Sequence, residues 1–185
     1  ILGDARSREM QSVMNRKIKF RESFRPFAPV ILADHVHEYF EMDEGQISPY
    51  MLLVADVQDG QRSELSDQDR QQRGVDKLQV CRSRVPAITH VDNSARVQTA
   101  DPVHAPELHR LLESFYQQTG CPLVVNTSFN IRGEPIVCTP EDAHRCFLAT
   151  NMDVLVIEGF VLLKDEQPDA PRHEIDAYIN QFPLD

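Results

Sequence analysis

The chain has 185 residues, of which 41% are hydrophobic, and this is enough for one sizeable core. Its 19 lysines and arginines stand against 29 aspartates and glutamates, and the net charge of -10 argues against a general nucleic-acid surface. No apolar stretch reaches the roughly 20 residues of a membrane span, and no signal peptide is visible. We therefore expect a single-domain, soluble, cytoplasmic protein with no nucleic-acid partner and no membrane.

Helical and extended patterns alternate in the first half of the chain. A helix is predicted from Ser7, as its N-cap, to about Arg16. β-Branched and aromatic residues favour strands at residues 30–33 and 50–57. Residues 58–77 are almost all polar and cannot bury enough apolar surface to order themselves, so we expect a mobile insertion there.

The second half contains two helix patterns with clear ends. A helix is predicted from Pro106 to Thr119, before Gly120, because apolar residues recur at helical spacing: Leu108, Leu111, Leu112 and Phe115. A second helix is predicted from Pro140 to about Asn151, with Thr139 as its N-cap.

The remaining elements are short strands and a tail. Strands are predicted at 85–91, 95–99 and 123–125, and as a tight hairpin at 154–157 and 160–163. The C-terminal tail, residues 165–185, carries a weak apolar stripe and either docks as a short helix or stays loose. Strands and helices mix without strict alternation, which predicts an α+β domain over residues 1–164.

Two segments combine cations, amides and hydroxyls in a way that suits a phosphate group. Five positive residues lie among apolar ones at residues 16–26. Residues 126–135 follow an apolar strand and carry side-chain donors: Asn126, Ser128, Asn130 and Arg132. Guanidinium groups that aromatic neighbours hold in place can grip phosphate bidentately. The two segments together suggest a clamp for a polyphosphate.

Simpler interpretations compete with each of these. A run of cations is more often a solvated surface, although the interleaved phenylalanines of 16–26 weigh against it. His35 and His37 have the spacing of a metal pair, but exposed histidines are the more frequent outcome, and we predict no metal site. Thr89 and His90 fit a structural network as well as they fit a site. The four cysteines have neither metal nor disulfide spacing, which indicates free thiols.

Familiar catalytic and nucleotide motifs are missing. The chain has no Gly-x-Gly-x-x-Gly and no P-loop, so a glycine cradle for nucleotide is excluded in those forms. It has no Gly-x-Ser-x-Gly either, and no cysteine has an assignable histidine partner. Covalent catalysis therefore has no candidate residue.

Five motifs follow one another along residues 1–164. They are Asn15-Arg16-Lys17-Ile18-Lys19-Phe20-Arg21-Glu22 with Phe24-Arg25-Pro26-Phe27-Ala28-Pro29, Ser48-Pro49-Tyr50-Met51, Ile88-Thr89-His90-Val91-Asp92, Ala95-Arg96-Val97-Gln98-Thr99, and Asn126-Thr127-Ser128-Phe129-Asn130 through Pro140-Glu141-Asp142. Together they closely resemble the C-terminal domain of the O-carbamoyltransferases of the nodulation-factor, cephamycin and tobramycin type. The chain departs from that family at the long 58–77 insertion and beyond Lys164.

The resemblance implies a YrdC-like mixed twisted sheet flanked by helices. It implies that this domain takes ATP, with Mg²⁺, and carbamoyl phosphate, and forms carbamoyl-adenylate. An N-terminal actin-like domain of the same protein would then pass the carbamoyl group to an acceptor hydroxyl. Because the chain begins at Ile1 without a methionine, we expect that domain to be missing here, and the isolated chain to be competent only for the adenylate-forming step. A homodimer is left open.

The resemblance also assigns roles to residues of this chain. Lys19, Arg25 and Arg96 are expected to be the catalytic residues, acting on the phosphates. Binding of nucleotide and phosphate is expected from a further set: Arg21, Thr89, His90, Asn126, Ser128, Asn130 and Arg132. The alternative is a non-catalytic module that binds nucleotide or phosphate without turnover.

Overall fold

The computed structural model describes residues 1–168 and 171–182. The chain divides into two compact units that we treat separately. The sheet unit comprises residues 1–11 and 26–127, and the hairpin unit comprises residues 12–25 and 128–185. This division was not expected from the sequence.

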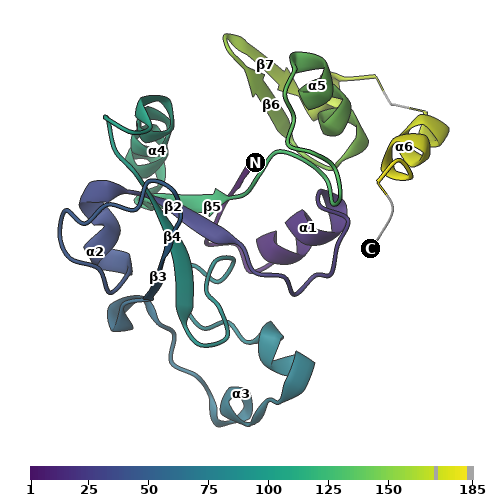
Figure 1. Cartoon of the computed structure of the whole chain (residues 1–185). Helices are drawn as coiled ribbons and strands as arrows, with labels where there is room; N and C mark the ends of the chain where they lie inside the picture. The colour runs from purple at the N-terminus through teal and green to yellow at the C-terminus, as the bar shows by residue number, and fades with distance from the viewer. Residues whose placement is uncertain (169–170, 183–185) are drawn as a thin grey trace. The chain divides into compact units, whose positions relative to one another are not determined.

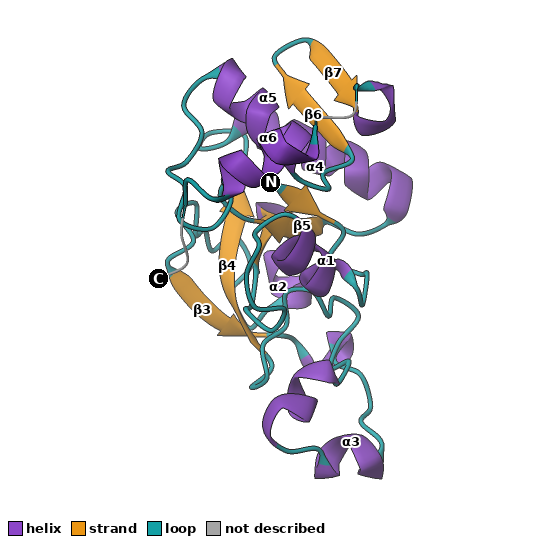
Figure 2. Cartoon of the chain, turned by 90° about the vertical axis from the view of Figure 1, so that its right-hand side faces the viewer, coloured by secondary structure: helices purple, strands orange, loops and turns teal. Residues whose placement is uncertain are grey.

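The sheet unit is built on a five-stranded mixed sheet (Figures 1 and 2). Its strands lie in the order β1 (Leu2–Gly3), β5 (Leu123–Asn126), β2 (Ala28–Leu32), β4 (Ser94–Ala100) and β3 (Leu53–Asp56). The central pair β2 and β4 is parallel, with Val30 beside Gln98, and the other pairs are antiparallel. The predicted α+β class with a mixed sheet is confirmed.

Helix α4 (Pro106–Thr119) covers one face of this sheet. Val30, Leu32 and Val124 form a buried cluster with Leu112 of the helix. Because successive side chains of a strand point to opposite faces, Ile31, which is also buried, belongs to the other face. Both faces of β2 are therefore covered, which explains its unbroken apolar sequence.

Several element ends agree with the sequence, and one predicted strand is wrong. Helix α4 has the predicted bounds and ends at Gly120, whose φ of 71° is left-handed. Residues 85–91 form turns rather than a strand, although Val85 and Ile88 are buried. A short apolar run does not distinguish a strand from a buried turn, and Pro86 cannot donate to a strand ladder.

The segment expected to be mobile contains local structure. Helix α3 (Asp67–Gln71) begins with a capping box in which the Ser66 hydroxyl accepts a hydrogen bond from the backbone N–H of Asp69. Short 3-10 helices lie at Asp59–Gln61 and Gly74–Gln79. Outside this segment, helix α2 (Val36–Tyr39) lies earlier in the chain, before β3. The mobility of 58–77 stays a prediction.

The hairpin unit contains most of α1 (Met10–Lys17), then α5 (Pro140–Ala149), β6 (Val154–Ile157), β7 (Phe160–Leu163) and α6 (Arg172–Ile179). Thr139 caps α5 as predicted, because its hydroxyl accepts the Asp142 N–H at 3.1 Å. The predicted hairpin is confirmed, and the register places four exposed apolar side chains on one of its faces: Val154, Val156, Val161 and Leu163. Helix α1 begins three residues later than expected from Ser7.

The tail beyond Lys164 includes an ordered helix. Helix α6 follows Pro171, and its Tyr178 side chain is 4% exposed. Residues 169–170 and 183–185 of the predicted tail lie outside the described residues. All four cysteines are free thiols. No helix within the described ranges is both long and apolar enough to cross a membrane.

The left-handed Gly120 gives a direct test of the α4 end. A Cβ at this position would touch nothing within 4 Å, so Gly120→Ala changes only the backbone preference. We expect a loss of about 1 kcal/mol in the free energy of unfolding, measured by urea denaturation. Gly60→Ala is the control, since its backbone is not left-handed and its Cβ also meets open space. Equal effects of the two changes would contradict the role of the left-handed turn.

Candidate functional site

The buried ammonium of Lys19 joins the two cationic segments of the sequence. Its Nζ lies 2.5 Å from the Ser128 carbonyl oxygen, 3.2 Å from Ser128 Oγ, and 3.0 and 2.8 Å from the carbonyl and Oδ1 of Asn130. Lys19 is only 3% exposed. An ammonium has three N–H donors, so four protein oxygens engage all of them. Lys19 therefore ties two segments more than 100 residues apart in the sequence.

The loop after α1 is wrapped around Asn15. The buried Asn15 amide donates to the carbonyls of Ser23 (3.1 Å) and Arg25 (2.8 Å), and its Oδ1 accepts from Arg21 Nε at 2.6 Å. Phe20 has a left-handed φ of 49°, which lets the chain turn back so that the Arg21 N–H reaches the Asn15 carbonyl. One amide side chain therefore fixes the course of residues 21–25.

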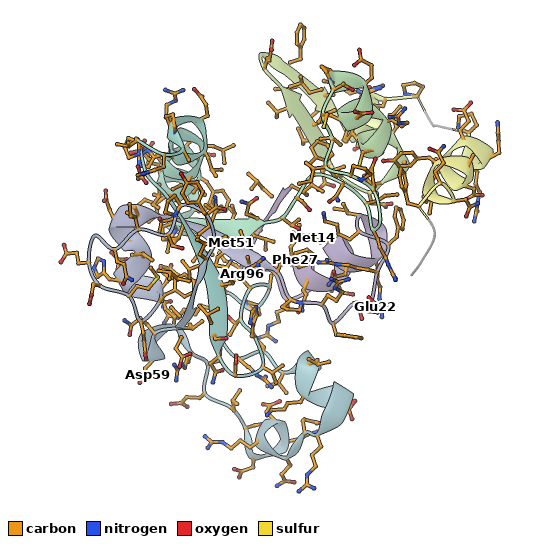
Figure 3. The ribbon with its side chains drawn as sticks, viewed as in Figure 1. Met14, Glu22, Phe27, Met51, Asp59 and Arg96 are labelled. Carbon is orange, nitrogen blue, oxygen red and sulfur yellow. The ribbon has the colours of Figure 1, made fainter. Side chains whose placement is uncertain are left out.

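Three arginines gather around Glu22, an exposed residue of this loop that Figure 3 labels. Arg132 NH1 lies 3.6 Å from the Glu22 carboxylate. The pKa of Glu22 is lowered, first by its own backbone N–H and then by Arg132, Arg25 and Arg21. Burial, followed by the charge of Arg25, lowers the pKa of Arg21. The structure thus brings three predicted phosphate-binding arginines into one cationic group that already holds a carboxylate.

The second segment forms a compact loop, residues 128–134, through its own side chains. The Ser128 hydroxyl donates to Asn130 Oδ1 at 2.7 Å, and the Asn130 amide donates to the Glu134 carbonyl at 2.7 Å. The Ile131 N–H donates to the Glu134 carboxylate at 2.8 Å. The Arg132 N–H donates to the Lys19 carbonyl at 3.1 Å, so backbone as well as side chain joins this loop to Lys19.

Four predicted site residues lie in the sheet unit instead. Arg96 is exposed on β4, where Figure 3 labels it, and its side chain forms no hydrogen bond or ion pair with the described residues. Thr89 is committed to the fold, because its hydroxyl lies 2.6 Å from Ser83 Oγ and donates to the Val85 carbonyl. His90 is half-buried, and burial lowers its pKa. Asn126 donates to Gln98 Oε1 at 2.7 Å.

Side-chain hydrogen bonds also join two motifs of the sheet unit. The Ser48 hydroxyl donates to the Val97 carbonyl at 2.8 Å, and the Ser48 N–H donates to Thr99 Oγ1 at 2.8 Å. Gln98 Nε2 donates to the Pro49 carbonyl at 3.0 Å. Met51, which follows directly, has a left-handed φ of 56°. Motifs that are far apart in the sequence are thus in contact within the sheet unit.

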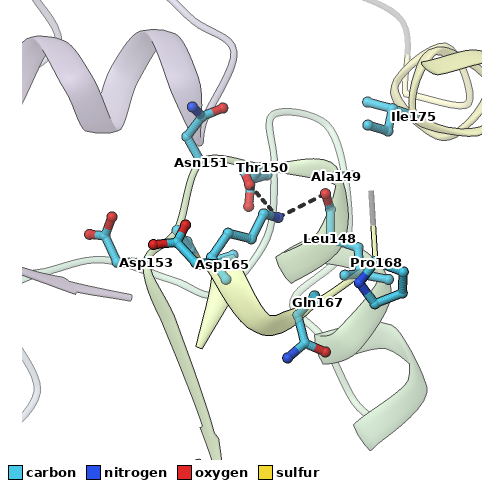
Figure 4. A pocket seen from close by; sticks show the side chains of 11 residues that line it. Leu148, Ala149, Thr150, Asn151, Asp153, Asp165, Gln167, Pro168 and Ile175 are labelled. Carbon is cyan, nitrogen blue, oxygen red and sulfur yellow. Dashed lines mark hydrogen bonds between the residues drawn. The ribbon is translucent and has the colours of Figure 1, made fainter. Parts of the chain in front are cut away.

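Other hollows and clusters do not coincide with the predicted residues. A pocket of about 580 Å³ in the hairpin unit is lined by Thr150, Asp153, Asp165 and Gln167 among others (Figure 4). Lys164 also lines it, but its ammonium donates to the carbonyls of Phe147, Leu148 and Thr150 at the end of α5. Among the described residues, no group of three or more histidine, cysteine or acidic side chains is arranged to hold a metal ion.

The structure identifies three residues that were absent from the predicted site. Asn15 and Glu22 belong to the quoted motif, but nothing in a single sequence distinguishes an amide that holds a loop from one that faces water. Glu134 accepts from the loop backbone and from the Tyr178 hydroxyl, 44 positions away in the sequence. Such a long-range contact leaves no local signal.

Comparison with known proteins identifies similar sequences. A family model described as "Carbamoyltransferase C-terminus" matches residues 1–164. An uncharacterized protein of Synechocystis is 56% identical over 185 residues, all of this chain and 29% of that protein. The nodulation protein NolO of Bradyrhizobium diazoefficiens is 35% identical over 165 residues, 89% of this chain and 26% of that protein. Nodulation protein U of Rhizobium tropici is 34% identical over 146 residues, 79% of this chain and 21% of that protein. The chain spans less than a third of the length of these relatives.

The environment of Lys19 predicts an unusual titration. Burial, and then the charge of Arg21, lowers the pKa of Lys19 from 10.5 to about 8. The chain has four lysines, so NMR of ¹³C-labelled lysine should resolve one Cε resonance that titrates near pH 8. Between these two pKa values the unfolded chain binds more protons, so stability gained from Lys19 rises with pH. Between about pH 8 and 10.5, the free energy of unfolding of the wild type should therefore rise relative to that of Lys19→Met. Parallel plots of the two free energies against pH would contradict this.

Proposed function

Because the chain belongs to the carbamoyltransferase family, as its C-terminal domain, we propose that it forms carbamoyl-adenylate from ATP and carbamoyl phosphate. The observation that carries the proposal is the Lys19 contact, which assembles the two cationic family motifs into one polar group. Activity of the whole protein and the acceptor of the carbamoyl group belong to the proposal as well, since the chain covers 20–29% of its relatives.

The chemistry needs charge neutralisation and alignment more than it needs a proton-transfer residue. Water releases phosphate from carbamoyl phosphate and leaves a carbamate. A carbamate oxygen attacks the α-phosphorus of ATP, the bond from that phosphorus to the bridging oxygen of the β-phosphate breaks, and pyrophosphate leaves with the electron pair. Negative charge stays spread over phosphate oxygens throughout. Guanidinium groups and amides are suited to bind it.

Within this scheme the cations have different tasks. Arg21, Arg25 and Arg132 would bind the phosphate groups, since they already surround a carboxylate. Lys19 would act as a positioning residue, because protein oxygens occupy its donors. This refines the catalytic role expected for it from the sequence. Arg96 is exposed on β4 of the sheet unit, and its role toward phosphate stays a prediction.

Amides, hydroxyls and the metal complete the proposal. Ser128 and Asn130 would shape the loop of residues 128–134 for phosphate. The nucleotide-binding roles of Asn126 and His90, which lie in the sheet unit, stay predictions. The described residues offer no metal cluster of their own, so Mg²⁺ would arrive bound to the phosphates of ATP, as it does in many nucleotide sites. Its chemistry there is to neutralise phosphate charge.

The alternative function is a module that binds nucleotide or phosphate without turnover. The saturated Lys19 favours it, since one expected phosphate ligand is withdrawn into the protein. Either function leaves transfer to the acceptor hydroxyl to an N-terminal actin-like domain that we propose as the partner. The two functions differ in whether the chain turns over.

The first test is exchange of labelled pyrophosphate into ATP that depends on carbamoyl phosphate. Arg132→Ala should lower this exchange by roughly tenfold, which corresponds to the loss of one charged hydrogen bond of about 1.5 kcal/mol. Arg110→Ala is the control, because Arg110 is an exposed arginine paired with Glu107 on α4. ATP binding by calorimetry without exchange would favour the module, and the absence of both would overturn the proposal.

Removal of the Glu22 charge gives a second test, in which ATP binding should become tighter rather than weaker. If phosphate occupies the cationic group, Glu22→Gln removes a competing negative charge from beside three arginines. We expect ATP to bind roughly threefold to tenfold more tightly, with a smaller gain at high salt. Glu158→Gln, at the exposed turn of the hairpin, should change nothing. A weaker affinity after Glu22→Gln would mean that this carboxylate orients the arginines instead.

A further inference from the structure

We propose that Tyr178, in the tail helix α6 outside the family-matched residues 1–164, is a positioning residue for the phosphate loop, residues 128–134. Its hydroxyl holds the carboxylate that fixes the backbone of that loop. Only the part of its test that measures ATP binding rests on the proposed function.

Tyr178 joins helix α6 to the rest of the hairpin unit. The Tyr178 ring is buried, meets Phe182 edge-on at 5.6 Å between ring centroids, and lies under the Arg145 guanidinium of α5 at 5.9 Å. The Tyr178 hydroxyl donates to Glu134 Oε1. A buried phenol needs a hydrogen-bond partner, so Glu134 determines how the ring sits.

Glu134 connects α6 to the loop. Its other carboxylate oxygen accepts the Ile131 N–H at 2.8 Å, and its backbone carbonyl accepts the Asn130 amide at 2.7 Å. Asn130 Oδ1 in turn lies 2.8 Å from Lys19 Nζ. A continuous series of hydrogen bonds therefore runs from Tyr178 through Glu134 and Asn130 to Lys19.

Loss of the Tyr178 hydroxyl should weaken phosphate binding through these hydrogen bonds. Without the Tyr178 hydroxyl, one oxygen of a partly buried carboxylate loses its donor and must find another. The charge of Glu134 also acts on the Lys19 ammonium, whose pKa it raises to a small extent. A carboxylate that leaves the Ile131 N–H would free the backbone of the loop, and its charge would repel phosphate bound there. Tyr178 thus keeps Glu134 directed at the backbone.

This arrangement connects the matched family region to the tail. The Glu134 carboxylate belongs to the matched region, and its partner Tyr178 lies beyond it.

Tyr178→Phe tests the proposal by removing a single oxygen. Amide hydrogen exchange of Ile131 should become at least tenfold faster, while the α5 amide of Ala143, which bonds to the Thr139 carbonyl, should keep its rate. ATP affinity, measured by calorimetry, should fall severalfold. Tyr116→Phe, on α4 of the sheet unit, is the matched control and should change neither quantity. Glu134→Gln should keep most of the Ile131 protection, since its amide can serve both neighbours, and Glu134→Ala should lose it.

The outcomes separate this proposal from the proposed function. An unchanged Ile131 rate in Tyr178→Phe overturns the positioning role, and so does faster exchange at both Ile131 and Ala143, which would indicate general loosening of the unit. A faster Ile131 with unchanged ATP affinity also overturns it, since the loop would then not govern phosphate binding. If wild type binds no ATP, the proposed function fails while the Ile131 rates still decide whether Tyr178 holds the loop.

Discussion

A charged ammonium buried among neutral oxygens is the interaction on which the hairpin unit depends. Removing Lys19 from water is costly, and the cost is offset only if every donor finds an acceptor. Four oxygens of Ser128 and Asn130 provide them. The need for such acceptors fixes the loop after β5 against the loop after α1. A lysine suits this task because its ammonium is compact and can donate in three directions.

The arginines complement this lysine by remaining near the surface. Their planar groups keep several donors in fixed directions, and the loop around Asn15 holds two of them in place. Asn15 and Lys19 therefore have the same effect. Each is a buried polar side chain whose hydrogen bonds fix a loop that carries arginines. This places rigid support beneath a group of like charges that would otherwise repel one another.

Sequence patterns predicted the elements better than they predicted the roles of site residues. Helix α4 and the hairpin follow from apolar spacing and turn residues, which act locally. The strand predicted at 85–91 was wrong because an apolar composition indicates that a segment is buried, not that its backbone is extended. Residue types indicated that Lys19 and Ser128 belong to a polar group, yet the direction of each donor depends on contacts 109 residues apart. Glu134 and Tyr178 were missed for the same reason.

The apolar face of the hairpin affects how the isolated chain behaves in solution. Val154, Val156, Val161 and Leu163 form an exposed apolar face on a two-stranded sheet, which favours self-association. The excess of ten negative charges opposes this, because chains of like charge repel one another before such faces meet. Acidic buffers near the isoelectric point of about 5.1, or concentrated salt, remove that protection. The acidity of the chain therefore serves its colloidal stability.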